Sequence, residues 1–583
     1  MSRPRRRVDP PFLVAGLVTA ALLVVMLYYP VGSVLVEAVF ADGRLTLVPI
    51  RDVLTDSLYF GDLADVFAGG SPLALVRAIL AGDASFGRFG FTAYQAVLST
   101  LLSLAIGLPG AYVLARYEFP GRRTVRSLTL VPFVLPSIMV AAGFAAMFGI
   151  NGPLNRALSA VGLPTVELMF TLEIILLAHA FYNAPLVVRV VAAAWEGVDA
   201  RAVETARSLG ASPRRAFLDV VVPQLAPAVL TSTLLVFSFT FMSFPIVLAL
   251  GGFQLATVEV FLYDRISRLQ LEEAAALAVL EAAITLGLTY AYLHYERVQA
   301  ATRGVAPRAR ERFLARFDLE RLAIAGYGFV IVVVFVGPIV SMLLASVLDA
   351  NGQFTIQYYG FLLDRRDAVV GTQPDVAIRN SLAFAVGTLA LAVPMGVVVA
   401  LATARDTLSA RVVGTLAMLP FAVSGVVVGL GLLQTVVFGV EVFGLQLQVT
   451  GAVAIVAAHA VGAYPFVVRT VTPALSSMDD RLVESARALG ASRTRALLDI
   501  ELPLVTPAVA AGAAFAFAIS IGEFNSTVVL VEGGDAYTMP VAVQRYLSDR
   551  TLGPATAMGS VLLVVTSVSF VVIERLGAYG GIE

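Results

Sequence analysis

The clearest chemical signal in this chain of 583 residues is an acidic side chain inside an apolar run. Glu523 stands in the stretch AISIGEFNSTVVL. A charged side chain at the centre of a bilayer costs on the order of 2.5–3.5 kcal/mol on the insertion scales for Asp, Lys and Arg, so such a residue is a candidate for function. Because Asn525, Ser526 and Thr527 make this run unusually polar, we interpret Glu523 as lining a solute pathway. The alternative is that its carboxylate only pairs with a neighbouring helix.

The corresponding position in the first half of the chain carries a hydroxyl group. Related stretches 280 positions apart place Ser243, in SFTFMSFPIVL, opposite Glu523. Phenylalanines stand beside both residues, and a carboxylate among aromatic rings suits a cation because the ring face attracts positive charge. Glu281, in another apolar run, is a secondary candidate. The candidate pathway residues are Glu523, Phe524, Asn525, Ser243, Phe241 and Phe244.

Two of the three histidines are also 280 positions apart. His179 lies in LLAHAFYNAPLVVR and His459 in VAAHAVGAYPFVVR. No cluster of metal-ligating residues surrounds either one, so a metal site has little support, and we favour a histidine that bonds across to a neighbouring helix. Pro185 and Pro465 follow in register. Because proline kinks a helix, this pair predicts two bent helices that suit a gate.

Two residue types are missing, and their absence excludes several classes of chemistry. The chain has no cysteine, which excludes disulfides, thiolate metal sites and cysteine nucleophiles. It also has no lysine, and a Walker A loop needs a lysine on the nucleotide phosphates. The sequence shows neither an HExxH motif nor a convergent nucleophile and base. We therefore expect that the chain is not an enzyme and that any ATP hydrolysis takes place on a separate subunit.

The candidate residues must be positioned by two homologous halves, because one segment occurs twice. Residues 199–229 read DARAVETARSLGASPRRAFLDVVVPQLAPAV, and residues 479–509 read DDRLVESARALGASRTRALLDIELPLVTPAV. The copies align without a gap, and we call them the repeat segments. Each predicts a helix that stops at Gly210 or Gly490, where glycine can adopt the left-handed conformation of a helix C-terminus, and then a second helix.

The repeat segments are polar and lie between apolar runs, so we expect them at the membrane surface. Ser212 and Ser492 are suited to cap the second helix. A duplicated connecting loop is the simplest interpretation. Both copies nevertheless retain an acidic residue in the first helix, the turn glycine and paired prolines before the next apolar run, and this retention favours a docking surface.

Composition independently requires a membrane. Hydrophobic residues make up 58% of the chain and charged residues 14%, and the mean hydropathy is +0.86. Since a span needs about 20 mostly apolar residues, we expect an all-α integral membrane protein of about twelve helices: a six-helix half at 1–300, a cytoplasmic linker at 301–321 and a second six-helix half at 322–583. The expected spans are 12–39, 92–115, 128–149, 171–194, 228–250, 273–294, 322–348, 381–403, 411–436, 450–471, 508–531 and 556–574.

The distribution of arginine predicts the orientation, because positive charge in short loops stays on the cytoplasmic side. Arginines precede the first span, fill the loop after the second and recur in the linker. We therefore expect a multi-pass protein of the cytoplasmic membrane with both termini and both repeat segments inside, and short external helices within 41–90. We prefer an uncleaved first helix to a signal peptide. The arginines are Arg3, Arg5, Arg6, Arg7, Arg116, Arg122, Arg123, Arg126, Arg297, Arg303, Arg308, Arg310, Arg312, Arg316 and Arg321.

The repeat segments resemble a known motif. The pattern Glu-x-Ala-x-x-x-Gly, then nine residues, an aliphatic residue, one more and Pro is similar to the EAA loop of permeases in binding-protein-dependent ABC importers. The resemblance implies a type I importer permease fold and a coupling helix seated on each of two copies of an ABC ATPase, which hold the ATP and Mg²⁺. No cofactor is expected on this chain. The implied coupling residues are Glu204, Ala206, Gly210, Pro223, Glu484, Ala486, Gly490 and Pro503.

Within that family the resemblance narrows to one branch. Two fused halves, the segment ILLAHAFYNAP, and IGEFNSTVVL before YTMPVAVQRYL are similar to thiamine permeases and to their relatives that import ferric iron. This implies a small cationic solute, thiamine first and ferric iron second, delivered by an extracytoplasmic solute-binding protein. The other expected partner is membrane lipid, with no nucleic acid. A twelve-helix secondary transporter is the alternative of a different class, but it gives no reason for duplicated EAA loops.

Overall fold

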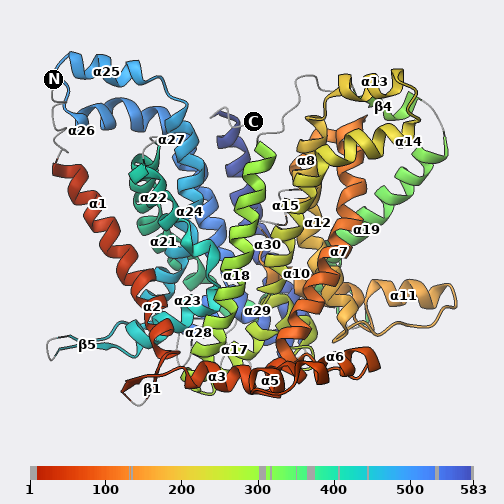
Figure 1. The fold of residues 1–583 in the computed structure, drawn as a ribbon, viewed down its shortest axis with the longest axis horizontal. Coiled ribbons are helices and arrows are strands. Elements are labelled where there is room, and N and C mark those ends of the chain that lie inside the picture. The colour runs from red at the N-terminus through yellow and green to blue at the C-terminus, as the bar shows by residue number, and fades with distance from the viewer. Residues whose placement is uncertain are drawn as a thin grey trace. The chain divides into compact units, whose positions relative to one another are not determined.

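The structure is a computed structural model that describes residues 10–41, 43–129, 132, 135–300, 310–315, 318–349, 351–363, 374–404, 408–442, 445–531, 537–549 and 551–579 (Figure 1). The arginines expected before the first span, and Arg303, Arg308 and Arg316 of the linker, lie outside these residues.

Among the described residues, eleven helices are long and apolar enough to cross a membrane, and a bent helix pair makes a twelfth if it is one span. The expected all-α membrane fold is therefore confirmed. Short π-helical turns join the pieces of three of these spans. In chain order the spans are α1 with α2 (Pro10–Leu23, Tyr29–Glu37), α7 (Gly87–Arg116), α10 with α11 (Ser137–Phe148, Pro153–Ala160), α12 (Leu172–Glu196), α14 with α15 (Pro213–Ala216, Val222–Phe241), α18 (Leu271–Ala300), α19 (Leu319–Val347), α21 (Pro374–Thr403), α24 (Gly451–Ser476), α26 with α27 (Arg493–Ala496, Leu502–Gly522) and α30 (Leu552–Tyr579).

The bent pair corresponds to the span expected at 411–436, and the prediction of one continuous helix there is wrong. α22 (Leu408–Ala417) and α23 (Gly425–Leu432) belong to helical stretches that meet at 92°. Pro420 lies in the 3-10 turn between them and lacks the N–H that a continuing helix would use. The Ser424 hydroxyl then accepts a hydrogen bond from the Val427 N–H at 3.2 Å, which caps the new helix.

The spans expected at 228–250 and 508–531 are also divided, at equivalent places. α15 ends at Phe241 and α16 covers Pro245–Gly251, while α27 ends at Gly522 and α28 covers Asn525–Leu530. In the first case the Pro245 ring would clash with the Phe241 carbonyl in a continuous helix. In the second case Glu523 binds backbone N–H groups of α28, as described below. Both breaks therefore fall on the candidate pathway residues.

Contacts divide the chain into two compact units that do not follow its linear halves. Unit 1 contains residues 1–37, 359–545 and 558–583, and unit 2 contains residues 38–358 and 546–557. The first helical span is thus part of unit 1, and α19, which opens the second half of the sequence, is part of unit 2. The first helical span of each half of the sequence therefore packs in the unit that contains most of the other half.

Glycines allow these first helical spans to pack closely against their neighbours within each unit. A Cβ on Gly431 would lie 2.4 Å from the Pro30 carbonyl oxygen in unit 1, and a Cβ on Gly143 would lie 2.8 Å from the Pro338 carbonyl oxygen in unit 2. Small residues let transmembrane helices approach each other in this way. In unit 2 the Tyr327 hydroxyl also donates to the Ile106 carbonyl at 2.7 Å.

Short elements surround the spans. The helices expected within 41–90 are confirmed as α3 (Val48–Thr55), α4 (Ser57–Phe60), α5 (Asp62–Phe67) and α6 (Pro72–Ala81). The remaining helices are α8 (Arg122–Leu128), α13 (Ala200–Ser208), α17 (Val258–Ser267), α20 (Gln357–Leu363), α25 (Asp480–Ala488) and α29 (Met539–Ser548). The strands are two-stranded pairs: β1 (Phe40–Ala41) with β2 (Arg44–Leu45), β3 (Tyr117–Glu118) with β4 (Glu311–Arg312), and β5 (Val440–Val442) with β6 (Leu445–Leu447).

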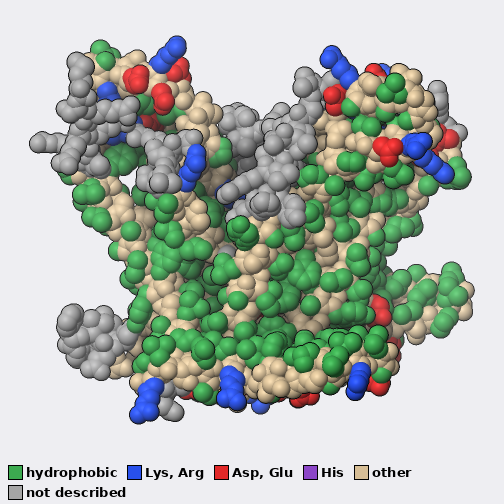
Figure 2. All heavy atoms as spheres, viewed as in Figure 1, with side chains coloured by type: hydrophobic (Ala, Val, Ile, Leu, Met, Phe, Trp, Pro, Cys, Tyr) green, Lys and Arg blue, Asp and Glu red, His purple; other side chains and the backbone are tan. Residues whose placement is uncertain are grey.

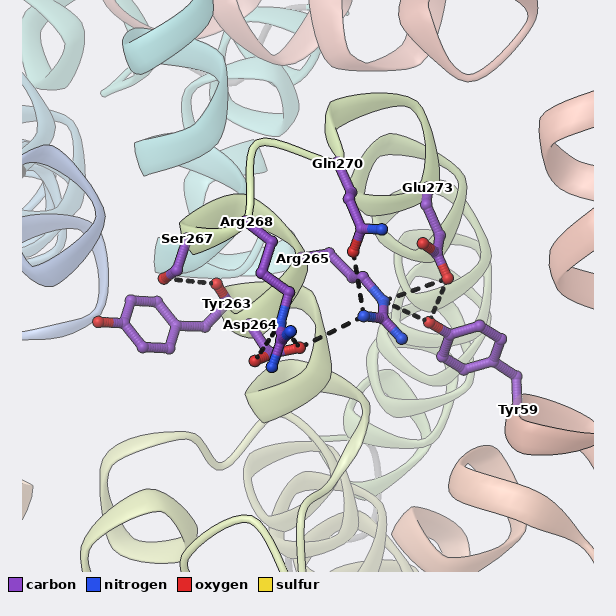
Figure 3. A network of polar contacts seen from close by, with 8 residues as sticks. All are labelled: Tyr59, Tyr263, Asp264, Arg265, Ser267, Arg268, Gln270 and Glu273. Atoms are coloured by element: carbon purple, nitrogen blue, oxygen red, sulfur yellow. Dashed lines mark hydrogen bonds and ion pairs between the residues drawn. The ribbon is translucent and has the colours of Figure 1, made fainter.

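A polar network fastens α4 to the corner between α17 and α18 (Figure 3). The Tyr59 hydroxyl donates to Glu273 Oε1 at 2.5 Å and accepts from Arg265 Nε at 2.9 Å. Burial and the hydrogen bond to Glu273 raise the pKa of Tyr59 well above its ordinary value. The phenol therefore stays protonated as a donor, and the short helices of unit 2 are tied to its transmembrane part.

Candidate functional site

Each repeat segment folds as two capped helices, as its sequence predicts. α13 and α25 begin after Asp199 and Asp479, whose carboxylates accept from the N–H groups two residues later at 2.9 and 3.0 Å. Ser212 and Ser492 cap α14 and α26 in the same way, accepting at 3.3 and 3.2 Å. These contacts satisfy backbone donors that a helix start leaves open. The two copies thus share their geometry as well as their sequence.

The turn between the helices depends on glycine. Gly210 and Gly490 have φ angles of +91° and +94°, in the left-handed region that a side chain disfavours. The following N–H groups bond back to the carbonyls of Ala206 and Ala486, both at 3.0 Å. This pattern closes the C-terminus of α13 and α25. The expected role of glycine in the turn is therefore confirmed at both positions.

An apolar side chain stands at the tip of each turn, and sequence reasoning missed it. Leu209 and Leu489 are 83% and 90% exposed. Burying a leucine side chain stabilises by about 1.5–3 kcal/mol relative to leaving it in water, so both tips are suited to enter an apolar pocket of a partner. The signal in the sequence is a leucine directly before the turn glycine in both copies.

The acidic residues of the motif lie on the open face of the same helices. Glu204 and Glu484 are exposed, and neither carboxylate has a hydrogen bond or ion pair to a described residue. Figure 2 shows charged side chains of both signs gathered over α13 and α14 in unit 2 and over α25 in unit 1. Each repeat segment therefore presents both an exposed carboxylate and an exposed leucine.

The repeat segments are continuous with the broken spans. Pro223 and Pro503 stand in the first turn of α15 and α27, directly after the π-helical turns at residues 217–221 and 497–501. The residues at their helix starts, Val221 and Glu501, keep helical backbone angles, so the helix continues through each π-helical turn. α15 and α27 then run to the helix breaks at Ser243 and Glu523. A single helical path thus joins each surface segment to a candidate pathway residue.

Glu523 holds the start of α28. Its carboxylate accepts from the Ser526 N–H at 2.9 Å and from the Thr527 N–H at 3.1 Å, and the Thr527 hydroxyl donates to it at 2.6 Å. His459 Nε2 lies 3.3 Å from the same carboxylate. The Glu523 side chain is 16% exposed. Its charge is therefore held by several donors within unit 1 while part of it stays accessible.

Both repeated histidines bond across to neighbouring helices, as expected for helix packing. His179 on α12 lies 2.9 Å from the Ser99 hydroxyl of α7 and 2.8 Å from the Ser243 hydroxyl at the break. In unit 1, His459 on α24 lies 2.8 Å from the hydroxyls of Ser520 and Thr527. Each histidine therefore fixes a helix break against the helix that precedes the repeat segment. No described group of three or more His, Cys, Asp or Glu side chains could hold a metal ion.

Replacing His179 with alanine should lower the thermal stability of the purified protein. The change leaves the buried hydroxyls of Ser99 and Ser243 without this partner, at a cost of about 1–3 kcal/mol for each unsatisfied group. Unfolding in detergent, followed by tryptophan fluorescence, measures the effect. Thr233→Ala is the matched control, because the Val229 carbonyl of its own helix is the only partner of its hydroxyl among the described residues. Equal shifts for the two variants would contradict the assignment.

The remaining candidates lie deeper in the units. Phe241, Phe244 and Phe524 are buried, and Asn525 is half-buried against Gly425, whose Cβ would lie 2.7 Å from Asn525 Cβ. Pro185 and Pro465 lie inside α12 and α24, which continue on both sides of them. Glu281 is buried on α18 beside the buried Glu259 of α17. In this conformation the polar, partly accessible members of the set are Glu523 and Asn525.

The linker makes specific contacts, whereas its sequence predicts only a cytoplasmic connection between the halves. β4 pairs in parallel with β3, and Arg116 contacts Glu311 at 3.1 Å. Glu196, at the end of α12 just before the first repeat segment, contacts Arg122 at 2.7 Å and Arg310 at 3.1 Å. Within unit 2, these ion pairs hold the linker against the end of α12 that leads into α13.

Known proteins resemble this chain along most of its length. The family model described as "Binding-protein-dependent transport system inner membrane component" matches residues 107–303 and 392–578. The chain is 28% identical to the thiamine transport system permease protein ThiP of Brucella abortus (strain 2308), over 88% of this chain and 93% of that protein. It is 27% identical to the ThiP of Escherichia coli (strain K12), over 84% and 88%. A probable sulfate transport system permease protein of Nephroselmis olivacea is 30% identical over 37% of this chain and 75% of its own length.

Proposed function

Because the chain belongs to the family of binding-protein-dependent transport system inner membrane components, it is an ABC importer permease, and we propose that its solute is thiamine or a close thiamine derivative. The family model matches it twice, once in each half. One chain thus supplies both permease halves of the importer. The single observation that carries the choice of solute is the similarity to two thiamine permeases over more than four fifths of this chain.

The chemistry of the helix break in unit 1 supports a cationic solute. Glu523 keeps a partly accessible carboxylate at the break, next to the half-buried Asn525. Thiamine carries a positive charge and two aromatic rings. A carboxylate held in place by several donors offers it a charge without having to reorganise, and the buried ring of Phe524 beside it would face the solute only after the helices move. The sulfate relative matches only 37% of this chain, which makes it the weaker guide.

The repeat segments would couple this movement to ATP. In our proposal, two copies of an ABC ATPase bind ATP and Mg²⁺ and receive the two turns, with Leu209 and Leu489 entering apolar pockets and Glu204 and Glu484 meeting positive groups. The continuous path through α15 and α27 would carry the displacement to Ser243 and Glu523. Pro185 and Pro465 would let α12 and α24 bend as the gate opens.

The proposal includes an orientation. The repeat segments, the linker and both termini face the cytoplasm, and the short helices α3–α6 face outward, where an extracytoplasmic solute-binding protein delivers the solute. Co-purification with a separate ATPase subunit would distinguish this importer from a twelve-helix secondary transporter, which needs none. Failure of any ATPase to associate, under conditions that keep the chain folded, would contradict the coupling role of the repeat segments.

A strain that cannot make thiamine and lacks this chain should need far more external thiamine to grow. Passive entry of a charged solute is slow, so uptake of labelled thiamine at nanomolar supply should fall to the background level of the strain. Plasmid-borne chain should restore it, and a chain carrying the coupling substitutions described in the Discussion should not. If thiamine uptake is unchanged while growth collapses under iron limitation, the solute is ferric iron, and the importer assignment stands.

A further inference from the structure

Helix α6 is apolar around its whole circumference. It reads PLALVRAILA, with Arg77 as its only polar side chain, and none of its residues is buried in the protein. Leu73 and Leu80 are 67% and 82% exposed. A helix apolar on all sides is normally enclosed by protein or membrane, because apolar side chains left in water forfeit the free energy of burial. Something outside the described chain must therefore cover α6.

The helix is too short to cross the membrane. Ten residues extend about 15 Å, whereas the hydrocarbon core is about 30 Å thick. Gly82, with φ at +79°, closes the helix by donating back to the Ala78 and Ile79 carbonyls, so the apolar segment does not continue. An apolar stretch of this length is typical of a segment that enters the membrane interface without crossing the bilayer.

The contacts around α6 connect it to the start of a membrane span. The loop after it is anchored on α5, where Ser85 donates its N–H to Asp62 Oδ2 at 2.9 Å. α4 in turn packs on the first turn of the transmembrane helix α7: the rings of Phe60 and Phe89 stack 4.5 Å apart. The chain therefore turns from α6 into a membrane span within six residues, which is at most about 20 Å.

The span that follows α6 also exposes apolar side chains. Tyr94, Val97 and Leu101 on α7 are exposed, as side chains that face lipid must be. Figure 2 shows apolar side chains over the band formed by the short helices at this end of unit 2. Arg77 is long enough to reach lipid phosphates while its stem stays in the apolar layer.

We propose that α6 is an interfacial anchor that lies in the lipid headgroup and acyl boundary of the leaflet at this end of unit 2. In the proposed topology this is the outer leaflet. The exposed apolar surface of α6, its single cationic side chain and its position within six residues of a span all favour lipid as the occupant. The inference does not depend on which solute the importer carries.

Spin labels can measure the depth of α6, and the absence of cysteine from the chain makes single-site labelling direct. The full chain would be labelled at Leu73→Cys, Val76→Cys or Leu80→Cys and placed singly in nanodiscs of phosphatidylethanolamine and phosphatidylglycerol. We expect collisions with oxygen to exceed those with a water-soluble nickel chelate several-fold, as they should at Tyr94→Cys on α7. Arg201→Cys on α13 is the water-exposed control and should show the reverse ratio.

Three other results would overturn the lipid assignment. Labels on α6 that behave like the label at Arg201→Cys would show a helix in water. Labels that neither reagent reaches in the isolated chain, but that become accessible when a nanodisc holds a single copy, would show contact with a second copy. Labels that meet water until purified solute-binding protein is added would assign the surface to that protein. A variant that fails to insert is recognised by its elution profile and replaced by the next position on the helix.

Discussion

Leucine at both turn glycines, Gly210→Leu with Gly490→Leu, is expected to abolish uptake while the chain still inserts into the membrane. The φ angles of +91° and +94° lie where an L-residue pays roughly 1–2 kcal/mol each. A Cβ at either glycine would meet no atom within 4 Å, so the cost falls on the backbone of the turn alone. The turn can relieve it only by changing conformation, which displaces Leu209, Leu489 and the exposed carboxylates from the positions that both copies share.

The measurements are co-purification of the ATPase subunit and uptake in vesicles loaded with ATP. Gly162→Leu is a matched control, because Gly162 has φ at +74° and open space around its Cβ position but lies outside the repeat segments. It should carry the same backbone strain and retain both ATPase binding and uptake. Survival of both activities in the double variant would mean that the repeat segments are only connecting loops.

Replacing the Glu523 carboxylate with a neutral amide is the second change with a large expected effect. Glu523→Gln keeps the side-chain volume, yet it replaces an acceptor of three hydrogen bonds with a group that has only one acceptor oxygen. Hydrogen bonds to a charged group contribute about 1.5–3 kcal/mol. If the solute loses a partner of that strength, uptake should fall by roughly one to two orders of magnitude, with the complex still assembled.

Thr527→Val is the control for Glu523→Gln. It removes the 2.6 Å hydrogen bond to Glu523 and preserves the charge, so it tests stability without testing the solute interaction. Uptake per folded complex should fall for Glu523→Gln and remain near normal for Thr527→Val. If both variants lose uptake only in proportion to lost complex, the carboxylate serves only to hold α28.

The sequence predicted most of the architecture because membrane spans and helix caps are local features. Long apolar runs, helix caps and turn glycines are each determined by a few neighbouring residues. Ser212 and Ser492 as caps, and Gly210 and Gly490 as turns, appear where they were expected, as do most of the spans. The helix breaks at Ser243 and Glu523 were not predicted, because the apolar runs continue on both sides of them. Pro245 was a visible signal for the first break, whereas the second depends on a side chain folding back onto the next helix.

The partners of the candidate residues could not be predicted in the same way. The sequence identifies His179 and His459 as a repeated pair. Ser99, which contacts His179, lies on α7, whose counterpart in the second half does not follow the same sequence offset. Gly107 and Gly396 make equivalent contacts, with Val187 and Val467, and are 289 rather than 280 positions apart. A length difference of this kind between the halves hides helix partners from any single alignment offset.

The exchange of first helices between the halves has a consequence for biogenesis. Unit 1 takes its first residues from 1–37 and its last from 558–583, so it cannot be completed until nearly the whole chain has left the ribosome. α1 and α2 must therefore remain in the bilayer without their partners from unit 1 while residues 38–358 of unit 2 are synthesised. Contacts so distant in sequence form slowly, and a nascent chain that stalls in its second half would leave the Pro30 surface without the Gly431 helix that contacts it.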